Sequence, residues 1–165
     1  MRPPIVPVVL ALVANGVIPG RCLHAQTPSR GTATIKLFFV ALEDNGKSGK
    51  KIGCNDSLVG VTRTIPARVA SLSAALAELV SSRDRYYGQS GLYNALSQST
   101  LTLVGVRLVN ERAEIDLSGT VSLAGACDRP RFEAQIKETA LQFPTVKTVV
   151  VHINGAPLET ILSGK

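Results

Sequence analysis

The sequence has little of the residue types on which most enzyme sites and large aromatic cores depend. It contains no tryptophan, one methionine and two histidines, and aromatic residues make up 4% of the chain. The core of the folded protein must therefore be mainly aliphatic. With 45% hydrophobic and 18% charged residues, the composition is typical of a folded globular protein and excludes a disordered or fibrous one. A chain of 165 residues has room for one domain and an export segment.

Metal and cofactor motifs are also missing. Beyond the first 25 residues His152 is the only histidine, and Cys54 and Cys127 lie too far apart in sequence to form a zinc-ligand pair. The glycine-containing stretch over residues 46–53 lacks the lysine pattern and the strand-to-helix setting of a phosphate-binding loop. The sequence therefore predicts no metal site and no cofactor.

No catalytic constellation is evident. The chain has no Gly-x-Ser-x-Gly turn, so a nucleophilic serine is not indicated. Glu114 and Asp116 project from the same face of a predicted strand and could in principle act as a carboxylate pair, but exposed carboxylates of this kind are usually only solvated. We expect no catalytic residues and no enzymatic activity. A hydrolase using Glu114, Asp116 or His152 is the alternative, which a deep pocket joining these side chains would favour.

The positive charge of the chain is dispersed. The formal net charge is +6, and Arg2 and Arg21 of the first 25 residues contribute to it. The remaining basic residues form no dense run and are not interleaved with aromatic residues, so nucleic acid is not an expected partner. Weak attraction to anionic polymers of a cell envelope is the alternative to a simply solvated surface.

The first 25 residues have the order of a secretory signal peptide. Arg2 is followed by the apolar run Val6–Val13, and the small residue Ala25 precedes a polar stretch. That run is far shorter than the roughly 20 residues needed to span a bilayer. We therefore predict a signal peptide over residues 1–25, no transmembrane segment in the mature chain, and a periplasmic or extracellular location.

The three cysteines bear on anchoring and on stability. Cys22 raises the alternative of lipid attachment, but Arg21 occupies the place where a lipoprotein signal has a small residue. Cys54 and Cys127 then remain, and an even number of cysteines in an exported chain predicts a disulfide. Two unrelated buried thiols are the alternative. Both cysteines lie in polar stretches that contain glycine rather than in apolar runs, which favours the disulfide.

Hydrophobic periodicity predicts an α+β fold for residues 33–163, after a flexible leader over residues 26–32. Period-two patterns and β-prone runs predict strands, and apolar stripes at helical spacing predict two helices. The turn signal Asn110-Glu111 favours a tight hairpin, and Asp128 is expected to cap the second helix. The expected architecture is a small mixed β-sheet with two helices packed on one face, in the order β-β-α-β-β-α-β with a short final strand or tail. The ranges are strands 34–42, 58–65, 101–109, 112–117 and 146–153, helices 69–80 and 128–143, and the tail 157–162.

A long loop over residues 83–99 contains every tyrosine of the protein: Tyr86, Tyr87 and Tyr93. Loops of this length in a compact domain are often functional or mobile. Tyrosine offers a large contact area at low entropic cost, so the three rings are a candidate interaction surface. The alternative is that one or two of them cover the open end of the core.

Several segments together resemble the GerMN family, also called the sporulation and spore germination family, over about residues 33–158. The most distinctive are Asp116-Leu117-Ser118 at the end of a strand and Gln142-Phe143-Pro144-Thr145-Val146 after the second helix. They are accompanied by Ile35-Lys36-Leu37-Phe38-Phe39, Ala74-Ala75-Leu76-Ala77-Glu78-Leu79-Val80, Leu103-Val104-Gly105-Val106 and Val151-His152-Ile153-Asn154-Gly155.

The resemblance implies an extracytoplasmic α+β domain without known enzymatic activity, of a kind that supports assemblies of other proteins. It carries no active-site residues that could be assigned to this chain. The first functional hypothesis is an exported protein-interaction or assembly module whose partner is an envelope protein. A binder of cell-wall glycan (peptidoglycan) or of a small ligand, served by the tyrosines and the modest positive charge, is the second.

Overall fold

A computed structural model describes residues 31–67 and 71–164 of the chain. The predicted signal peptide and Cys22 lie outside the described residues, as do residues 26–30 of the predicted leader. Thr32, which the sequence analysis assigned to that leader, already belongs to the first strand. Among the described residues no helix is both long enough and apolar enough to cross a membrane.

The N-terminal half forms an antiparallel sheet of three strands in the order β1-β3-β2. The long strands β1 and β3 pair along their whole length, with Phe39 opposite Val59. Alternate side chains of β1, including Phe39, are buried, as the period-two pattern predicts. A 3-10 turn, η1, separates β2 from β3. The bounds are β1 (Thr32–Ala41), β2 (Lys50–Lys51), η1 (Gly53–Asn55) and β3 (Ser57–Pro66).

The C-terminal half forms a mixed sheet of four strands in the order β4-β5-β6-β7. β5 pairs antiparallel with β4 and parallel with β6. The turn residues Asn110 and Glu111 have φ angles of 50° and 61°, which is the backbone conformation of a two-residue hairpin. The predicted hairpin is therefore confirmed. The bounds are β4 (Thr100–Val109), β5 (Arg112–Thr120), β6 (Thr148–Ile153) and β7 (Ala156–Pro157).

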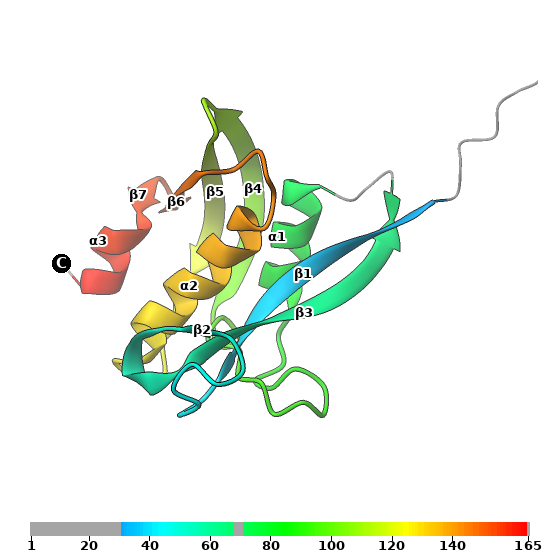
Figure 1. The fold of residues 1–165 in the computed structure, drawn as a ribbon. Coiled ribbons are helices and arrows are strands. Elements are labelled where there is room, and N and C mark those ends of the chain that lie inside the picture. The colour runs from blue at the N-terminus through cyan, green and yellow to red at the C-terminus, as the bar shows by residue number, and fades with distance from the viewer. Residues whose placement is uncertain (1–30, 68–70, 165) are drawn as a thin grey trace, which may run out of the picture.

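Two helices contact strands of both sheets, and Figure 1 shows them between the β1–β3 pair and strands β4 and β5. Ser71 caps α1, because its hydroxyl accepts a hydrogen bond from the amide of Ala74 at 3.2 Å. Asp128 begins α2 as its first helical residue and is not the capping residue that the sequence analysis expected. The bounds are α1 (Leu72–Ser81), α2 (Asp128–Leu141) and a third helix, α3 (Leu158–Ser163).

The α+β class and the order of the main elements are confirmed, and two details differ. The strands form two sheets and not one, because β1 and β3 bury their apolar side chains against helices that also contact the second sheet. The tail over residues 157–162 is mostly helical and is not a strand. Leu158 and Leu162, one helical turn apart, are both buried, which explains why the tail forms α3.

Candidate functional site

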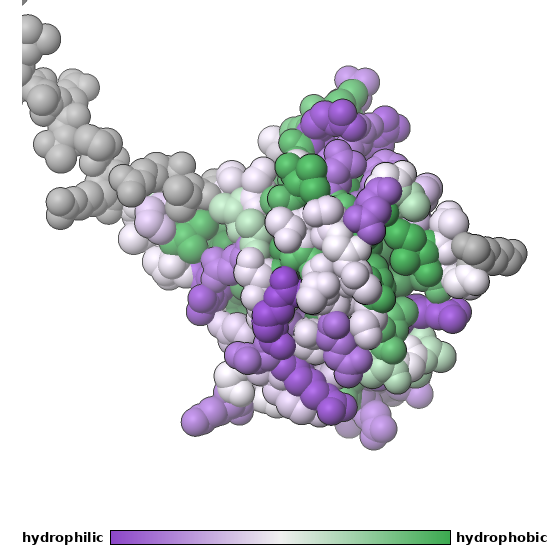
Figure 2. All heavy atoms as spheres, turned by 180° about the vertical axis from the view of Figure 1, so that it is seen from behind, coloured by the Kyte–Doolittle hydropathy of each residue, from purple (hydrophilic) through white to green (hydrophobic). Residues whose placement is uncertain are grey.

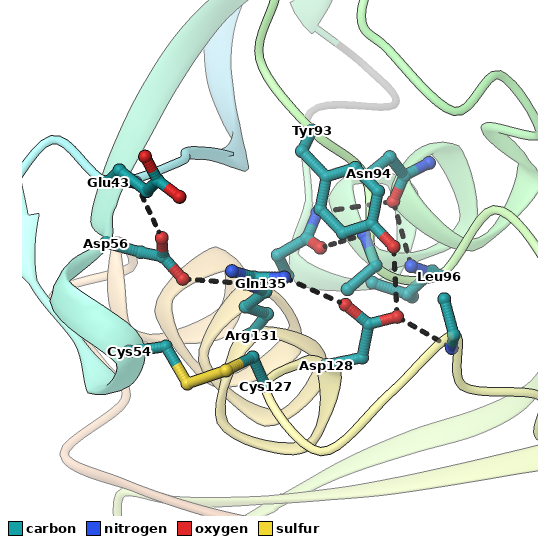
Figure 3. A network of polar contacts seen from close by, with 12 residues as sticks. Glu43, Cys54, Asp56, Tyr93, Asn94, Leu96, Cys127, Asp128, Arg131 and Gln135 are labelled. Carbon is teal, nitrogen blue, oxygen red and sulfur yellow. Dashed lines mark hydrogen bonds and ion pairs between the residues drawn. A yellow bond between two sulfur atoms is a disulfide. The ribbon is translucent and has the colours of Figure 1, made fainter.

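Six polar side chains with little contact with solvent meet where the residue before β3, the loop after α1 and the start of α2 come together (Figure 3). We call them the polar network. Asp56 and Gln135 are fully buried, and Asp128 and Tyr93 are only 3% and 4% exposed. Buried polar groups of this kind need hydrogen-bond partners, and among the described residues no buried side-chain nitrogen or oxygen lacks one. The members are Asp56, Tyr93, Asn94, Asp128, Arg131 and Gln135.

Arg131 lies between the two carboxylates of the polar network. Its Nε is 2.6 Å from Asp56 Oδ2, and its Nη1 is 3.3 Å from Asp128 Oδ1. Burial alone would lower the pKa of Arg131, but the hydrogen bonds and charges of Asp56 and Asp128 outweigh it and raise that pKa. The remaining oxygen of Asp56 accepts a hydrogen bond from the amide of Glu43 at 2.9 Å. The ion pairs thus join the residue between η1 and β3 to the first turns of α2.

Tyr93 completes the charged part of the network. Its hydroxyl donates to Asp128 Oδ2 at 2.9 Å, and the same oxygen accepts from the amide of Ala124 at 2.8 Å. Burial, together with the hydrogen bond to Asp128, raises the pKa of Tyr93 to about 12. The phenol is therefore a neutral hydrogen-bond donor at physiological pH.

Asn94 and Gln135 attach the loop between α1 and β4 to the rest of the domain. Gln135 Nε2 donates to the carbonyl of Phe38 at 2.8 Å, and Gln135 Oε1 accepts from the amide of Ala95 at 2.8 Å. The side chain of Asn94 donates to the carbonyl of Ser82 at 3.0 Å and accepts from the amide of Leu96 at 3.1 Å. These bonds tie the second half of the long loop to α2 and to the beginning of the loop at Ser82.

A disulfide joins Cys54 of η1 to Cys127, the residue before α2, across 73 residues of sequence. Figure 3 shows it beside Arg131 and Asp56. The covalent bond and the ion pairs of Arg131 therefore connect the same two parts of the chain.

The three tyrosines of the predicted interaction surface occupy different environments. Tyr93 is buried in the polar network, and Tyr87 stacks on the buried ring of Phe39 with 4.6 Å between ring centroids. Only Tyr86 is well exposed, at 44%. Tyr87 and Tyr93 thus cover the core, which was the alternative considered from sequence, and an interaction surface that includes Tyr86 remains a prediction.

The structure brings Glu114, Asp116 and His152 together on one face of the second sheet. Arg112 and Arg107 lie 2.7 and 3.1 Å from the Glu114 carboxylate, and His152 Nδ1 lies 3.5 Å from Asp116. The hydrogen bond from Arg112 is the main cause of a lowered pKa of Glu114. An ionised carboxylate paired with two arginines is poorly suited to donate a proton. The arrangement favours a surface ion-pair cluster.

Strand β4 forms one edge of the second sheet, and no strand among residues 31–67 and 71–164 pairs with its outer side. Three apolar side chains of β4 are exposed: Val104 at 66%, Leu108 at 49% and Val109 at 43%. A register shift between Leu103 and Gly105 marks a β-bulge at Val104. Figure 2, seen from the side opposite to Figure 1, shows hydrophobic residues (green) next to hydrophilic ones (purple) near the β4–β5 hairpin at the top.

A cleft of 310 Å³ runs beside this edge, between α1 and the first half of β4. Arg83 closes one side of it, since its guanidinium donates to the carbonyls of Ser99 and Leu101, the latter at 3.0 Å. The remaining lining comes from Ala77, Val80, Ser81, Thr102 and Leu103.

Sequence reasoning did not identify the polar network. A signal was available, because Gln135 and Thr139 alternate with Phe132, Ile136 and Ala140 on the buried face of α2. In the described part of the chain no cluster of three or more metal-ligating side chains is present.

Comparison with known proteins identifies the type of domain. Residues 36–159 match the model of a family described as sporulation and spore germination. A comparison with curated proteins finds no match.

Two solved structures share the fold at 19% sequence identity. The tandem GerMN domains of the sporulation protein GerM from Bacillus subtilis match with a TM-score of 0.54 over 87% of this chain and 43% of that one. The first GerMN domain of the same protein matches with a TM-score of 0.53 over 77% of this chain and 86% of that one. This chain thus spans less than half of the tandem structure. Because the family model covers most of its length, the chain belongs to the sporulation and spore germination family.

Proposed function

We propose that this chain is an exported, non-enzymatic envelope domain that binds another protein and so acts as an interaction or assembly module. The observation that carries the proposal is the uncovered edge of β4, with Val104, Leu108 and Val109 exposed along it. Edge strands with exposed apolar side chains are ready templates for a further strand. Monomeric proteins commonly protect such edges, and here the apolar side chains lie in the open.

The partner that fits this edge is an extended segment of an envelope protein. Main-chain groups of β4 would supply hydrogen bonds, and side chains of the segment would contact the exposed apolar side chains of Leu108 and Val109. The bulge at Val104 divides the edge into two straight parts, so the added strand would pair with only one of them. In the first part Arg83 already donates to the carbonyls of Ser99 and Leu101, so the part from Gly105 to Val109 is the one open to an added strand.

Export is supported by the predicted signal peptide and by the disulfide between Cys54 and Cys127, since disulfides persist mainly outside the cytoplasm. The absence of enzymatic activity is supported by the pairing of Glu114 with Arg107 and Arg112. Export and the absence of enzymatic activity are therefore both parts of the proposal.

The test compares two single substitutions of exposed strand residues. Val104→Asp places a charge on the β4 edge, and Thr64→Asp places one on β3 of the other sheet as a matched control. Each protein is expressed in its native host, cross-linked and purified from the envelope, and the attached proteins are identified by mass spectrometry. We expect Thr64→Asp to retain the partner and Val104→Asp to lose it, with unchanged circular dichroism spectra for both.

Retention of the same partner by Val104→Asp and by a further variant, Leu108→Asp, would contradict the proposed edge. Absence of any attached protein from the native protein and from all three variants would contradict the interaction function itself.

Cell-wall glycan binding is the second candidate, favoured by the exposed ring of Tyr86 and the adjacent guanidinium of Arg85, 5.7 Å from the ring centroid. Sedimentation of the domain with purified peptidoglycan, abolished in Tyr86→Ala, would support this function in place of protein binding.

A further inference from the structure

We infer that a small cleft between the loop after α1 and the start of α2 binds a single carboxylate of a peptide ligand, with Arg85 as the residue that holds it. This site shares no residue with the β4 edge, so either site can exist without the other.

The cleft has the size of one side chain. Its volume is 160 Å³, and a cavity of about 150 Å³ is sufficient for a molecule such as benzene. An extended sugar chain would not enter it. Its walls combine apolar surface with two guanidinium groups and the disulfide, and come mainly from Leu42, Arg85, Tyr93, Ala124, Cys127 and Arg131.

Arg85 carries the unused charge of the cleft. Its guanidinium carbon lies 5.7 Å from the ring centroid of Tyr86 and 6.0 Å from that of Tyr93. No carboxylate among the described residues lies within ion-pair distance of it, whereas Arg131 is engaged with Asp56 and Asp128. Stacking on aromatic rings orients a guanidinium but leaves its N–H donors free in the plane. A carboxylate is the group that this planar fork of donors binds best.

The acidic residue of the cleft does not oppose an incoming carboxylate strongly. Asp128 is already compensated, because one oxygen accepts from the Tyr93 hydroxyl and the Ala124 amide, and the other lies 3.3 Å from Arg131. Its oxygens are thus hydrogen-bonded within the polar network, and Arg85 adds a second cation to the one that Asp56 and Asp128 share.

The backbone at Arg85 is fixed before any ligand arrives. Its carbonyl accepts a hydrogen bond from the amide of Asn94 at 2.9 Å, and Tyr86 and Tyr93 form a β-bridge on the same loop. Asn94 itself is fully buried and bonded to Gln135 of α2. A binding group carried on a rigid base loses little entropy on binding.

A peptide is the source of carboxylate that these walls favour. The side chain of aspartate or glutamate, or a chain terminus, can place its charge on Arg85 while its short aliphatic part contacts Leu42 and the disulfide. The carboxylate of N-acetylmuramic acid is on a short lactyl ether arm, close to a bulky sugar ring that the cleft is too small to take in.

The experiment is an NMR titration of the ¹⁵N-labelled domain with N-acetyl-glutamate amide as the peptide carboxylate. N-acetyl-glutamine amide serves as the uncharged control, and N-acetylmuramic acid as the glycan carboxylate. We expect shifts at Arg85, Tyr86 and residues 124–128 with the glutamate derivative alone. Arg85→Gln should weaken binding by at least about tenfold, the usual scale for losing a charged hydrogen bond. Arg129→Gln, which removes an exposed neighbouring cation, should leave binding unchanged.

Equal shifts with the glutamine derivative, unchanged affinity in Arg85→Gln, or an equal loss in Arg129→Gln would each overturn the site. Tighter binding of N-acetylmuramic acid would overturn the peptide source. Circular dichroism of Arg85→Gln, and of Arg85→Lys as a variant that keeps the charge, verifies that the exposed substitution leaves the fold intact.

Discussion

The hydroxyl of Tyr93 donates a hydrogen bond of 2.9 Å to the carboxylate of Asp128, and thereby joins the loop after α1 to the first turn of α2. The ring itself is buried against the cleft that contains Arg85 and the disulfide. This contact makes the stability of the domain sensitive to the ionisation of one phenol.

Stability should fall at alkaline pH because of Tyr93. The pKa of an unfolded tyrosine is about 10, and that of Tyr93 in the folded protein is raised to about 12. The stabilisation is therefore fully present below pH 10 and is lost as the pH rises through 12. Urea unfolding measured at intervals from pH 9 to 12 should show a steeper decline for the native protein than for Tyr93→Phe. Tyr86→Phe should keep the native slope, and equal slopes for all three proteins would contradict the assignment.

Arg131→Met should be strongly destabilising, because it leaves the fully buried carboxylate of Asp56 without its counter-ion. Loss of one partner of a buried ion pair costs roughly 3–5 kcal/mol. Arg107→Met is the matched control, since Arg107 also faces two carboxylates but is 68% exposed, and its loss should cost less than about 1 kcal/mol. The two free energies of unfolding, from urea titration followed by circular dichroism, should differ accordingly. Similar losses of unfolding free energy in Arg131→Met and Arg107→Met would mean that the buried ion pair stabilises the fold no more than the exposed one.

The disulfide between Cys54 and Cys127 should be present in the native protein and should stabilise it. Mass spectrometry of the protein from its native envelope should detect alkylation of both cysteines only after reduction. The double variant Cys54→Ser, Cys127→Ser should lose roughly 2–4 kcal/mol of unfolding free energy, as expected for the closure of a long loop. Alkylation of either cysteine without a reductant would show that the bond is absent there.

Gly119→Ala should be far more damaging than Gly105→Ala, although both glycines lie in the paired strands β4 and β5. A Cβ added at Gly119, where φ is 129°, would lie 1.8 Å from the carbonyl oxygen of Thr100. At Gly105 a Cβ would meet no atom within 4 Å. Thermal unfolding should therefore show a large drop for Gly119→Ala and almost none for Gly105→Ala. A comparable drop in both variants would contradict the register of the β4–β5 pair.

Local sequence signals predicted the elements well but their assembly less well. The turn at Asn110-Glu111 and the apolar stripe of α2 depend on neighbouring residues, and both were recognised. The division of the strands into two sheets depends on which faces meet the helices, which no local pattern encodes. The tail after Pro157 was misassigned because the spacing of Leu158 and Leu162 was too short a pattern to identify a helix.

The candidate sites likewise depend on long-range contacts that local sequence signals do not reveal. Tyr93, Asp56 and Gln135 belong to residue types that are mostly exposed or only partly buried, so sequence alone gave no reason to place them together in the interior. Each of them is bonded to a residue from a distant segment of the chain. Tyr93 is bonded to Asp128, Asp56 to Arg131 and Gln135 to the carbonyl of Phe38. Long-range pairing of this kind becomes visible only when the fold is known.

The bond between Cys54 and Cys127 closes a covalent ring that contains β3, α1, β4 and β5. A protease that cuts the loop between α1 and β4 would therefore open the ring without releasing a fragment. Both halves would stay attached through the sulfur atoms, and the sheets and the polar network would hold them in place. A nicked molecule would still behave as one domain, and only cleavage combined with reduction would separate it into two pieces.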